Sequence, residues 1–154
     1  MTIQSRPESI ETAVAVDQWS DAAWNSLLPA FDDGLFEQLS RPANGAHLGL
    51  SRLVLRRGQR LAGAAQVILI RPFGLRSGIA YVKFGPMWRP KDAEPLVSDL
   101  KALVAALIHE YAHERRLHVT VQPPPDPEFA GVVAAALIDC GLRRRPQTTD
   151  PHRY

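Results

Sequence analysis

The motif with the clearest chemical meaning in this sequence is His109-Glu110-Tyr111-Ala112-His113, which fits the pattern H-E-x-x-H. In that pattern two histidines one helical turn apart bind zinc, and the glutamate serves as a general base. A zinc hydrolase is therefore one hypothesis for this chain. His118 and Glu128 are the candidate third ligands that such a site would need.

The predicted surroundings of this motif argue against a metal site. Apolar periodicity predicts a helix over residues 93 to 117, with an inward stripe of Leu96, Val97, Leu100, Leu103, Val104, Leu107, Ile108 and Tyr111. At about 100° per residue, His109 and His113 lie opposite that stripe, so we expect both to face solvent. A zinc site instead needs converging ligands inside an apolar shell. We therefore interpret the motif as the polar side of a helix and expect no metal ligands.

A second group of candidate residues lies on a strand predicted over residues 79 to 88. With period two, Tyr81, Lys83 and Gly85 point to one face of that strand. A lysine beside a tyrosine, followed by a kink at Gly85-Pro86, could line a cleft for a phosphorylated or carboxylated ligand. The alternative is an edge strand whose polar face is simply solvated.

The composition is that of one globular domain. The chain has 154 residues, of which 45% are hydrophobic, and its 18 Lys+Arg against 16 Asp+Glu give a formal charge of +2. This small excess is spread along the chain, so nucleic acid is not expected as an obligatory partner. One cysteine, Cys140, excludes an internal disulfide, and we interpret it as a buried structural thiol. Without a signal peptide or a membrane-length apolar run, we expect a cytoplasmic protein with no membrane span.

The order of predicted elements is that of a mixed α/β domain. Residues 1 to 11 are expected to be a loose N-terminal segment. Strands are predicted at residues 12–17, 48–57, 60–71, 79–88 and 118–122, with Gly58-Gln59 as a hairpin turn and residues 142–154 as a possible edge strand. Helices are predicted after the N-cap Ser20, over residues 34–40 and 93–117, and from Asp126-Pro127 to a stop at Gly141. No Ser-His-Asp set and no phosphate-binding P-loop can be assembled from the spacing.

Several stretches, taken in order, resemble a known superfamily. They are RLAGAAQVILIRPFG (60–74), AYVKFGPMW (80–88), the long helix, VTVQPPPDPE (119–128) and CGLRRRPQTTDPHRY (140–154). The chain is similar to the N-terminal half of the Fem-type peptidoglycan bridge aminoacyltransferases and to their relatives in the GNAT-like acyltransferase superfamily. The step formed by Tyr81, Gly85 and Pro86 is the most specific of these matches.

This resemblance implies an α/β fold with a GNAT-like mixed, largely antiparallel sheet and flanking helices. It implies a single domain over residues 12 to 154 that forms half of a two-domain family architecture. The implied activity is transfer of an acyl or aminoacyl group to an amine. The implied donor is acyl-CoA or aminoacyl-tRNA, with no bound cofactor and no nucleic acid beyond that tRNA, and the implied acceptor is a small molecule or a cell-wall precursor. If the chain has such a site, we expect Tyr81, Lys83 and Arg89 to bind the acceptor, with Gly85 and Pro86 shaping the cleft. The expected partner is a second GNAT-like domain or a homodimer subunit.

The sequence departs from the superfamily pattern in two places. It ends at Tyr154, where the family continues into a second domain, and an active site between two domains would then be half present. The stretch GPMWRPKDAEP lacks the Arg/Gln-x-x-Gly-x-Gly/Ala loop that holds the pyrophosphate of acetyl-CoA at a helix N-terminus. The alternative to an acyltransferase is therefore a non-catalytic or truncated GNAT-like module that binds or associates, and the zinc hydrolase remains a remote third hypothesis.

Overall fold

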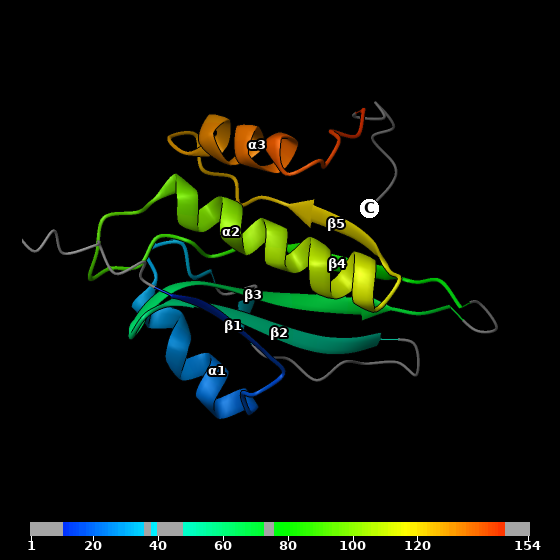
Figure 1. Ribbon diagram of the computed structural model, residues 1–154, viewed down its shortest axis with the longest axis horizontal. Helices are drawn as coiled ribbons and strands as arrows, with labels where there is room; N and C mark the ends of the chain where they lie inside the picture. The colour runs from blue at the N-terminus through cyan, green and yellow to red at the C-terminus, as the bar shows by residue number, and fades with distance from the viewer. Residues whose placement is uncertain (1–10, 36–37, 40–47, 73–75, 147–154) are drawn as a thin grey trace, which may run out of the picture.

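The computed structural model describes residues 11–35, 38–39, 48–72 and 76–146, which form a single sheet with helices on both faces (Figure 1). The five strands are β1 Thr12–Val16, β2 Leu48–Arg57, β3 Arg60–Ile70, β4 Ile79–Lys83 and β5 His118–Gln122. The helices are α1 Asp21–Leu27, the 3-10 turn η1 Leu28–Ala30, α2 Val97–Leu107, the π-helix η3 Ile108–Glu114 and α3 Ala130–Asp139.

The sheet is mixed and largely antiparallel, as the sequence predicts. Its strand order is β1-β2-β3-β4-β5, and each neighbouring pair is antiparallel except β4 and β5. The predicted meander of β2, β3 and β4 is confirmed, and Gly58 has the positive φ of 62° that the hairpin turn requires. The parallel pair is joined by α2, because parallel neighbours need a crossover connection.

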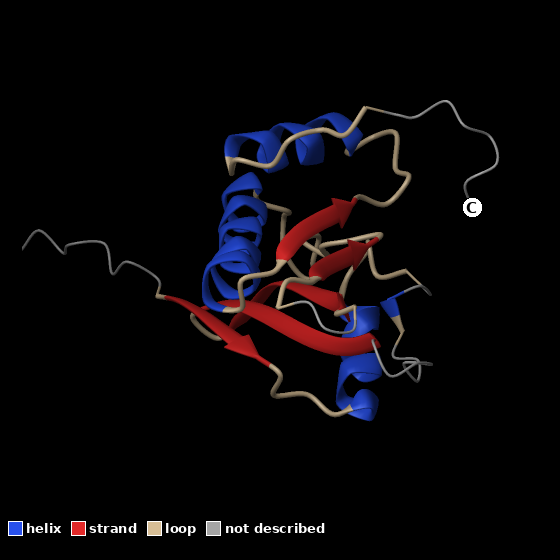
Figure 2. Ribbon diagram, turned by 90° about the vertical axis from the view of Figure 1, so that its right-hand side faces the viewer, coloured by secondary structure: helices blue, strands red, loops and turns tan. Residues whose placement is uncertain are grey.

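Both faces of the sheet are covered, which explains why the central strands are apolar throughout. Helices α2 and α3 lie on one side and α1 on the other (Figure 2). On β2, Leu53 and Leu55 pack in the cluster beneath α2, while Val54 packs with Trp24 of α1. Successive side chains of β2 thus pack into two separate hydrophobic cores, one on each face of the sheet.

Helix α1 begins where the sequence predicts. The Ser20 side chain accepts a hydrogen bond from the Ala23 backbone N–H at 3.2 Å, which is N-capping geometry. Trp24 is fully buried, and its indole N–H donates to the backbone carbonyl of Gln38 at 2.8 Å. The helix predicted over residues 34–40 lies largely outside the described residues.

The long helix starts later than predicted and changes type before it ends. It begins at Val97, because the residue before Pro95 is pushed away from helical geometry and Leu96 is extended, with φ −109° and ψ 126°. Leu96 and Val97 are therefore each 42% exposed, so placing them on the inward stripe was wrong. The last seven helical residues form the π-helix η3, which periodicity alone did not indicate.

The remaining elements bound the candidate site. Strand β4 lies between β3 and β5, so the alternative of a solvated edge strand is wrong. Helix α3 ends at Asp139, and the positive φ of 97° at Gly141, just beyond the cap residue Cys140, confirms the predicted stop. Residues 142–146 form no strand, and the rest of the predicted edge strand lies outside the described residues.

Among the described residues, no helix is long and apolar enough to cross a membrane.

Candidate functional site at the end of β4

Tyr81 lies where β4 and β5 run side by side. The two strands pair in register, with Lys83 opposite Gln122. The Tyr81 hydroxyl donates a hydrogen bond to the side-chain oxygen Oε1 of Gln122. Burial raises the pKa of Tyr81, which keeps the phenol protonated as a donor. Tyr81 therefore fixes the side chain of Gln122 on the neighbouring strand.

The expected alternation along β4 holds as far as Lys83 and then fails. Ala80 and Val82 are fully buried and Lys83 is exposed. Phe84 then has a φ of 51°, and the Gly85-Pro86 peptide bond is cis. A Cβ built on Gly85 would lie close to both Gln38 and Val82, so the period-two alternation of the strand cannot be extended to Gly85.

The break after Lys83 is a bulge and not the end of the pairing with β3. Ile68 pairs with Tyr81, whereas Ala64 pairs with Met87, which leaves two extra residues on the side of β4. Met87 and Ala64 exchange both backbone hydrogen bonds, at 2.8 and 2.9 Å. Bulges of this kind redirect side chains at sheet edges and beside active sites.

Gln38 supports this bulge from the face that α1 covers. Its side-chain amide Nε2 donates to the backbone carbonyl of Lys83. The same nitrogen would lie 2.9 Å from a Cβ added to Gly85. The Gln38 side chain is almost completely buried. A side chain at position 85 would therefore have to displace the amide of Gln38, a constraint that the sequence did not reveal.

Arg89 is not a free cation. One guanidinium nitrogen, Nη2, lies 3.0 Å from Oδ2 of Asp126, and Nε lies 4.0 Å from Oδ2 of Asp33. The guanidinium also stacks on Phe129, 4.1 Å from the ring centroid. Arg89 thus joins the segment after β4 to the loop that precedes α3, and any anionic ligand would have to compete with Asp126.

Asp33 is the buried acid of this group, and sequence analysis missed it. Its carboxylate accepts hydrogen bonds from the backbone N–H groups of Trp88 at 2.9 Å and Arg89 at 3.2 Å. Burial raises the pKa of Asp33, and these N–H groups and the Arg89 charge oppose that rise only in part. The sequence Asp32-Asp33-Gly34 is typical of a turn. It does not predict which distant backbone N–H groups the Asp33 carboxylate binds.

The hollow between these groups is small. It is lined by Asp33, Trp88, Arg89, Pro124, Asp126, Phe129, Ala130 and Val133, and its volume is about 10 Å³. That is room for about one water molecule. A substrate at this place would therefore lie over Arg89 and Asp126, at the surface, and not inside a preformed cavity.

The N-terminus of α2 is occupied by a carboxylate of the protein itself. Asp99, in the first turn of α2, is 2% exposed and lies 2.5 Å from Arg57 Nη2 and 2.9 Å from Arg60 Nη2. A negative charge is favourable at this end of a helix. The pair of arginines comes from the β2–β3 hairpin, so this contact fixes the hairpin to the helix.

The two histidines of the H-E-x-x-H motif lie on the solvent side of η3, as predicted. Both are exposed, and their ring centroids are 6.4 Å apart. Glu110, the residue that would act as base, instead binds Nε of Arg115 at 2.8 Å. Within the described part of the chain, no group of three or more His, Cys, Asp or Glu side chains could hold a metal ion.

A second polar cluster, which sequence analysis also missed, lies beneath η3. The buried hydroxyls of Ser51 and Tyr111 are 2.7 Å apart, and Ser51 donates to Asp17 at 2.8 Å. Asp17 also binds Arg115 at 3.0 Å. Burial raises the pKa of Tyr111 to about 12, although the Ser51 hydrogen bond and the Arg115 charge act in the opposite direction. Because its hydroxyls are shielded from solvent, we interpret this cluster as structural.

The strand order, the parallel β4 and β5 joined by α2, and the helices on both faces define a GNAT-like α/β fold. Among solved structures, the chain is similar to FemX, with a TM-score of 0.62 and 16% identity over 82% of this chain and 31% of the FemX chain. It is also similar to an aminoglycoside acetyltransferase from an uncultured soil metagenomic sample, with 14% identity over 93% of this chain and 94% of that chain. The TM-score is 0.59 for its complex with trehalose and 0.58 for its complex with sisomicin.

These likenesses are likenesses of fold. The chain spans only 31% of the length of FemX, so what FemX does as a whole is not thereby assigned to this chain. No protein-family model matches the sequence, and no curated protein matches it either. The GNAT-like fold expected from the sequence is nevertheless confirmed.

Proposed function

We propose that this chain is an acyltransferase-type domain that transfers an acyl or aminoacyl group to an amine. The observation that carries the proposal is the fold shared with an aminoglycoside acetyltransferase over nearly the whole of both chains. The donor is an acyl-CoA or an aminoacyl-tRNA, and the acceptor is an amine-bearing small molecule or a cell-wall precursor. We place this activity in the cytoplasm, where such donors are made.

We assign acceptor binding to the end of β4. Lys83 is exposed, and no ion pair holds its ammonium group among the described residues. It is thus available to an anionic group of a substrate. Asp126, with 30% of its side chain exposed, is the carboxylate that a cationic amine could reach beside Arg89. Gly85 and Pro86, both buried, set the course of the chain between Lys83 and Arg89, and Tyr81 holds Gln122 in place.

The chemistry that this proposal requires is modest. The attacking amine must lose a proton, and the tetrahedral oxyanion must be met by hydrogen-bond donors. The Tyr81 hydroxyl already donates to Gln122, and the backbone N–H groups of Gly85 and Met87 already donate within the sheet. The exposed ammonium group of Lys83 is the donor that could meet this oxyanion. Neither requirement calls for a metal ion.

The proposal is tested by incubating the protein with acetyl-CoA and a panel of amines that includes sisomicin, and by measuring release of CoA with a thiol reagent. We expect release that depends on the amine. Lys83→Ala should lower kcat/KM by about tenfold, the loss expected when a charged hydrogen bond of roughly 1.5 kcal/mol is removed. Lys91→Ala, which removes an exposed lysine outside the assigned site, should change kcat/KM little.

A donor that binds without turnover is detected by thermal unfolding. A ligand at 100 times its Kd stabilises the protein by about 2.7 kcal/mol. If neither acyl-CoA nor aminoacyl-tRNA stabilises the protein and no amine is acylated, the acyltransferase proposal is wrong.

A non-catalytic binding module is the second candidate function, and two features favour it. Strands β4 and β5 pair over all five residues, and the Gly85 N–H continues the pairing to the Gln122 carbonyl at 3.3 Å. The two strands therefore leave no gap between them for an acyl donor. Arg89 is already neutralised by Asp126. In this case the chain would act through association with a second GNAT-like domain or a second subunit.

A further inference from the structure

Helix α3 has an outer face that nothing in the described structure covers. It is the outermost element on its side of the molecule in both ribbon views (Figures 1 and 2). Of its ten residues, AGVVAAALID, only Asp139 is charged. Its inner face is buried through Val133 and Ala136. A helix that is apolar on all sides is normally buried on all sides.

The uncovered face is apolar and contains small residues at its centre. Its exposed members are Gly131, Val132, Ala135, Ile138 and Asp139. Ile138 is 56% exposed, the largest value among the large apolar side chains described, and Val132 is 38% exposed. Gly131, Ala135 and Ile138 are spaced by four and three residues, and Val132, Ala135 and Asp139 by three and four. This spacing places all five on one side of the helix. We call these five residues the outer face of α3.

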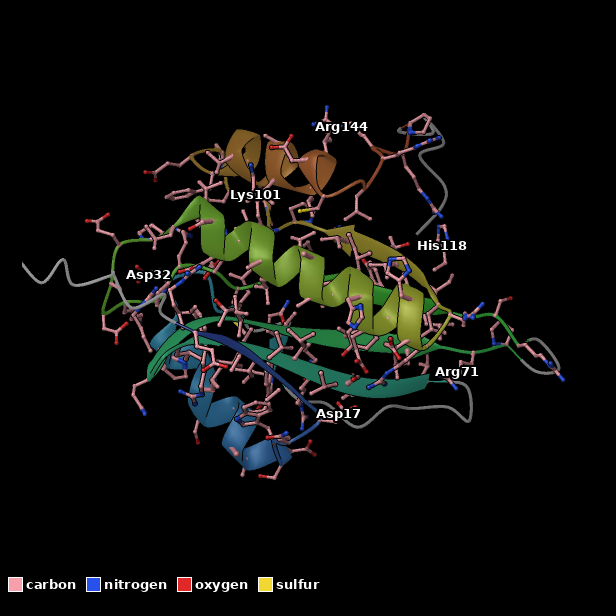
Figure 3. The ribbon with its side chains drawn as sticks, in the orientation of Figure 1. Asp17, Asp32, Arg71, Lys101, His118 and Arg144 are labelled. Carbon is pink, nitrogen blue, oxygen red and sulfur yellow. The ribbon has the colours of Figure 1, made fainter. Side chains whose placement is uncertain are left out.

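The two ends of α3 carry opposite charges. Glu128 precedes the helix and is exposed, and Arg143 to Arg145 follow it and are exposed. Among the described residues, none of these four takes part in an ion pair. Arg144 extends from the segment beyond the C-terminal end of α3, and Lys101 of α2, which pairs with Asp139 at 3.0 Å, lies beneath the helix (Figure 3).

We propose that the outer face of α3 binds the same face of a second copy of this chain, in an antiparallel arrangement about a two-fold axis. A two-fold interface must be self-complementary, so each residue meets a position related to it by the axis. With the axis at Ala135, Val132 packs on the partner's Ile138 and Ala135 faces the partner's Ala135. The small residue on the axis allows the two helices to approach closely.

The charges select the antiparallel arrangement over a parallel one. Antiparallel pairing about Ala135 brings Glu128 beside the partner's Arg143 and Arg144, and does so twice. A parallel arrangement would instead place the two arginine clusters together. The helix dipoles also oppose each other favourably when the helices are antiparallel. Electrostatic complementarity of this kind fixes register and suppresses the wrong orientation.

The dimer that this face can form is weak. A ten-residue helix is about 15 Å long, so the contact lies at the small end of specific interfaces. We therefore expect association that depends on protein concentration and weakens with added salt, because the pairs between Glu128 and the arginines are screened. This inference does not depend on the proposed acyltransferase activity.

Sedimentation velocity over a micromolar to millimolar series tests the proposal. The wild-type chain should shift from monomer to dimer, and Ala135→Glu should raise the dimer Kd by more than about tenfold, since it places two carboxylates on the axis. Ala105→Glu, the same change at an exposed position of α2, is the matched control and should leave the Kd unchanged. A chain that stays monomeric at every concentration, or a dimer that Ala135→Glu does not weaken, would overturn the proposal.

Charge reversal tests the register. Glu128→Arg should weaken the dimer, and adding Arg144→Glu to the same chain should restore part of the loss, because each reversed residue then meets a reversed partner. Oxidation of Ala135→Cys, in a Cys140→Ser background, should give a disulfide-linked dimer, whereas Ala105→Cys should not. Failure of Ala135→Cys to cross-link while dimers are present would place the interface elsewhere and contradict the proposal.

Discussion

Gly85 is the residue of the candidate site with the least room for change. A Cβ at this position would lie 2.9 Å from Nε2 of Gln38 and 3.1 Å from Cγ1 of Val82. Both neighbours are held, Gln38 by its bond to the Lys83 carbonyl and Val82 by the core. Gly85→Ala should therefore lower the free energy of unfolding by about 1–3 kcal/mol, the usual cost of overpacking. Urea denaturation measures this loss.

Gly131 provides the matched control for that substitution. It lies near the start of α3, and a Cβ there would meet nothing within 4 Å. Gly131→Ala should raise the free energy of unfolding by about 0.5–1 kcal/mol, because alanine loses less conformational entropy in a helix. Both variants should be compared at dilutions where the chain is monomeric. Equal effects of the two substitutions would mean that Gly85 is not constrained by Gln38.

Arg89 shows what a single residue's position in the sequence can and cannot reveal. The sequence suggests Arg89 as an acceptor-binding residue, and the structure places it in the segment that follows β4, paired with acidic side chains. Its partners Asp33 and Asp126 lie 56 and 37 residues away in the sequence. Such distant contacts depend on how loops meet in three dimensions, which neither periodicity nor turn composition encodes.

At the scale of elements, the π-helix η3 is attached to the centre of β2 through hydroxyl groups. Tyr111 of η3 is fully buried, and its hydroxyl meets that of Ser51 at 2.7 Å. Ser51→Ala leaves the Tyr111 hydroxyl buried without this partner, so it should cost about 1–3 kcal/mol. Tyr111→Phe removes only one hydrogen bond and should cost about 1 kcal/mol.

The double variant distinguishes this pair from two independent contacts. Because Ser51→Ala and Tyr111→Phe together leave no unpaired hydroxyl between η3 and β2, their combined cost should be smaller than the sum of the single costs. Chemical denaturation of the four proteins gives the coupling energy. Additive costs would show that the two hydroxyls do not depend on each other.

The elements that the sequence predicted well are those with local signals. The β2–β3 hairpin has its turn at Gly58, α1 has its N-cap at Ser20, and α3 has its stop at Gly141. The start of α2 was misplaced because Leu96 fits the apolar helical pattern although it precedes the helix, which begins at Val97. The π-helix was missed because its apolar stripe differs little from that of an α-helix over one or two turns.

At the scale of the whole molecule, Asp17 makes stability depend on pH. Burial disfavours its charge, but hydrogen bonds from the Arg52 backbone, Ser51 and Arg115 outweigh burial and lower the pKa of Asp17. The stabilisation from its charge is therefore complete above the ordinary aspartate range and is lost as pH falls through the lowered pKa. Asp33 has the opposite effect because its pKa is raised. Its ionisation lowers the free energy of unfolding as pH rises from the ordinary aspartate pKa to the raised one.

Asp17→Asn removes this dependence while keeping an oxygen that accepts from Ser51 and Arg52. The variant should be less stable than wild type at neutral pH, and the difference should shrink as the solution is acidified. Thermal unfolding measured as a function of pH follows both proteins. Asp92→Asn, at an exposed carboxylate, serves as the control and should run parallel to wild type. A difference that is constant at every pH would mean that the charge of Asp17 does not stabilise the fold.

The order of the strands also has a consequence for how the molecule assembles. Strands β2, β3 and β4 follow one another along the chain, whereas β1 joins β2, and β5 joins β4, only after long connections are closed. Closing such connections costs entropy and slows folding. We therefore expect the two edge strands β1 and β5 to join the sheet last. The hydrogen bond between Asp17 and Ser51 links the segment after β1 to β2, and the hydrogen bond between Tyr81 and Gln122 links β4 to β5. We therefore expect the candidate site to form only when β5 has joined the sheet.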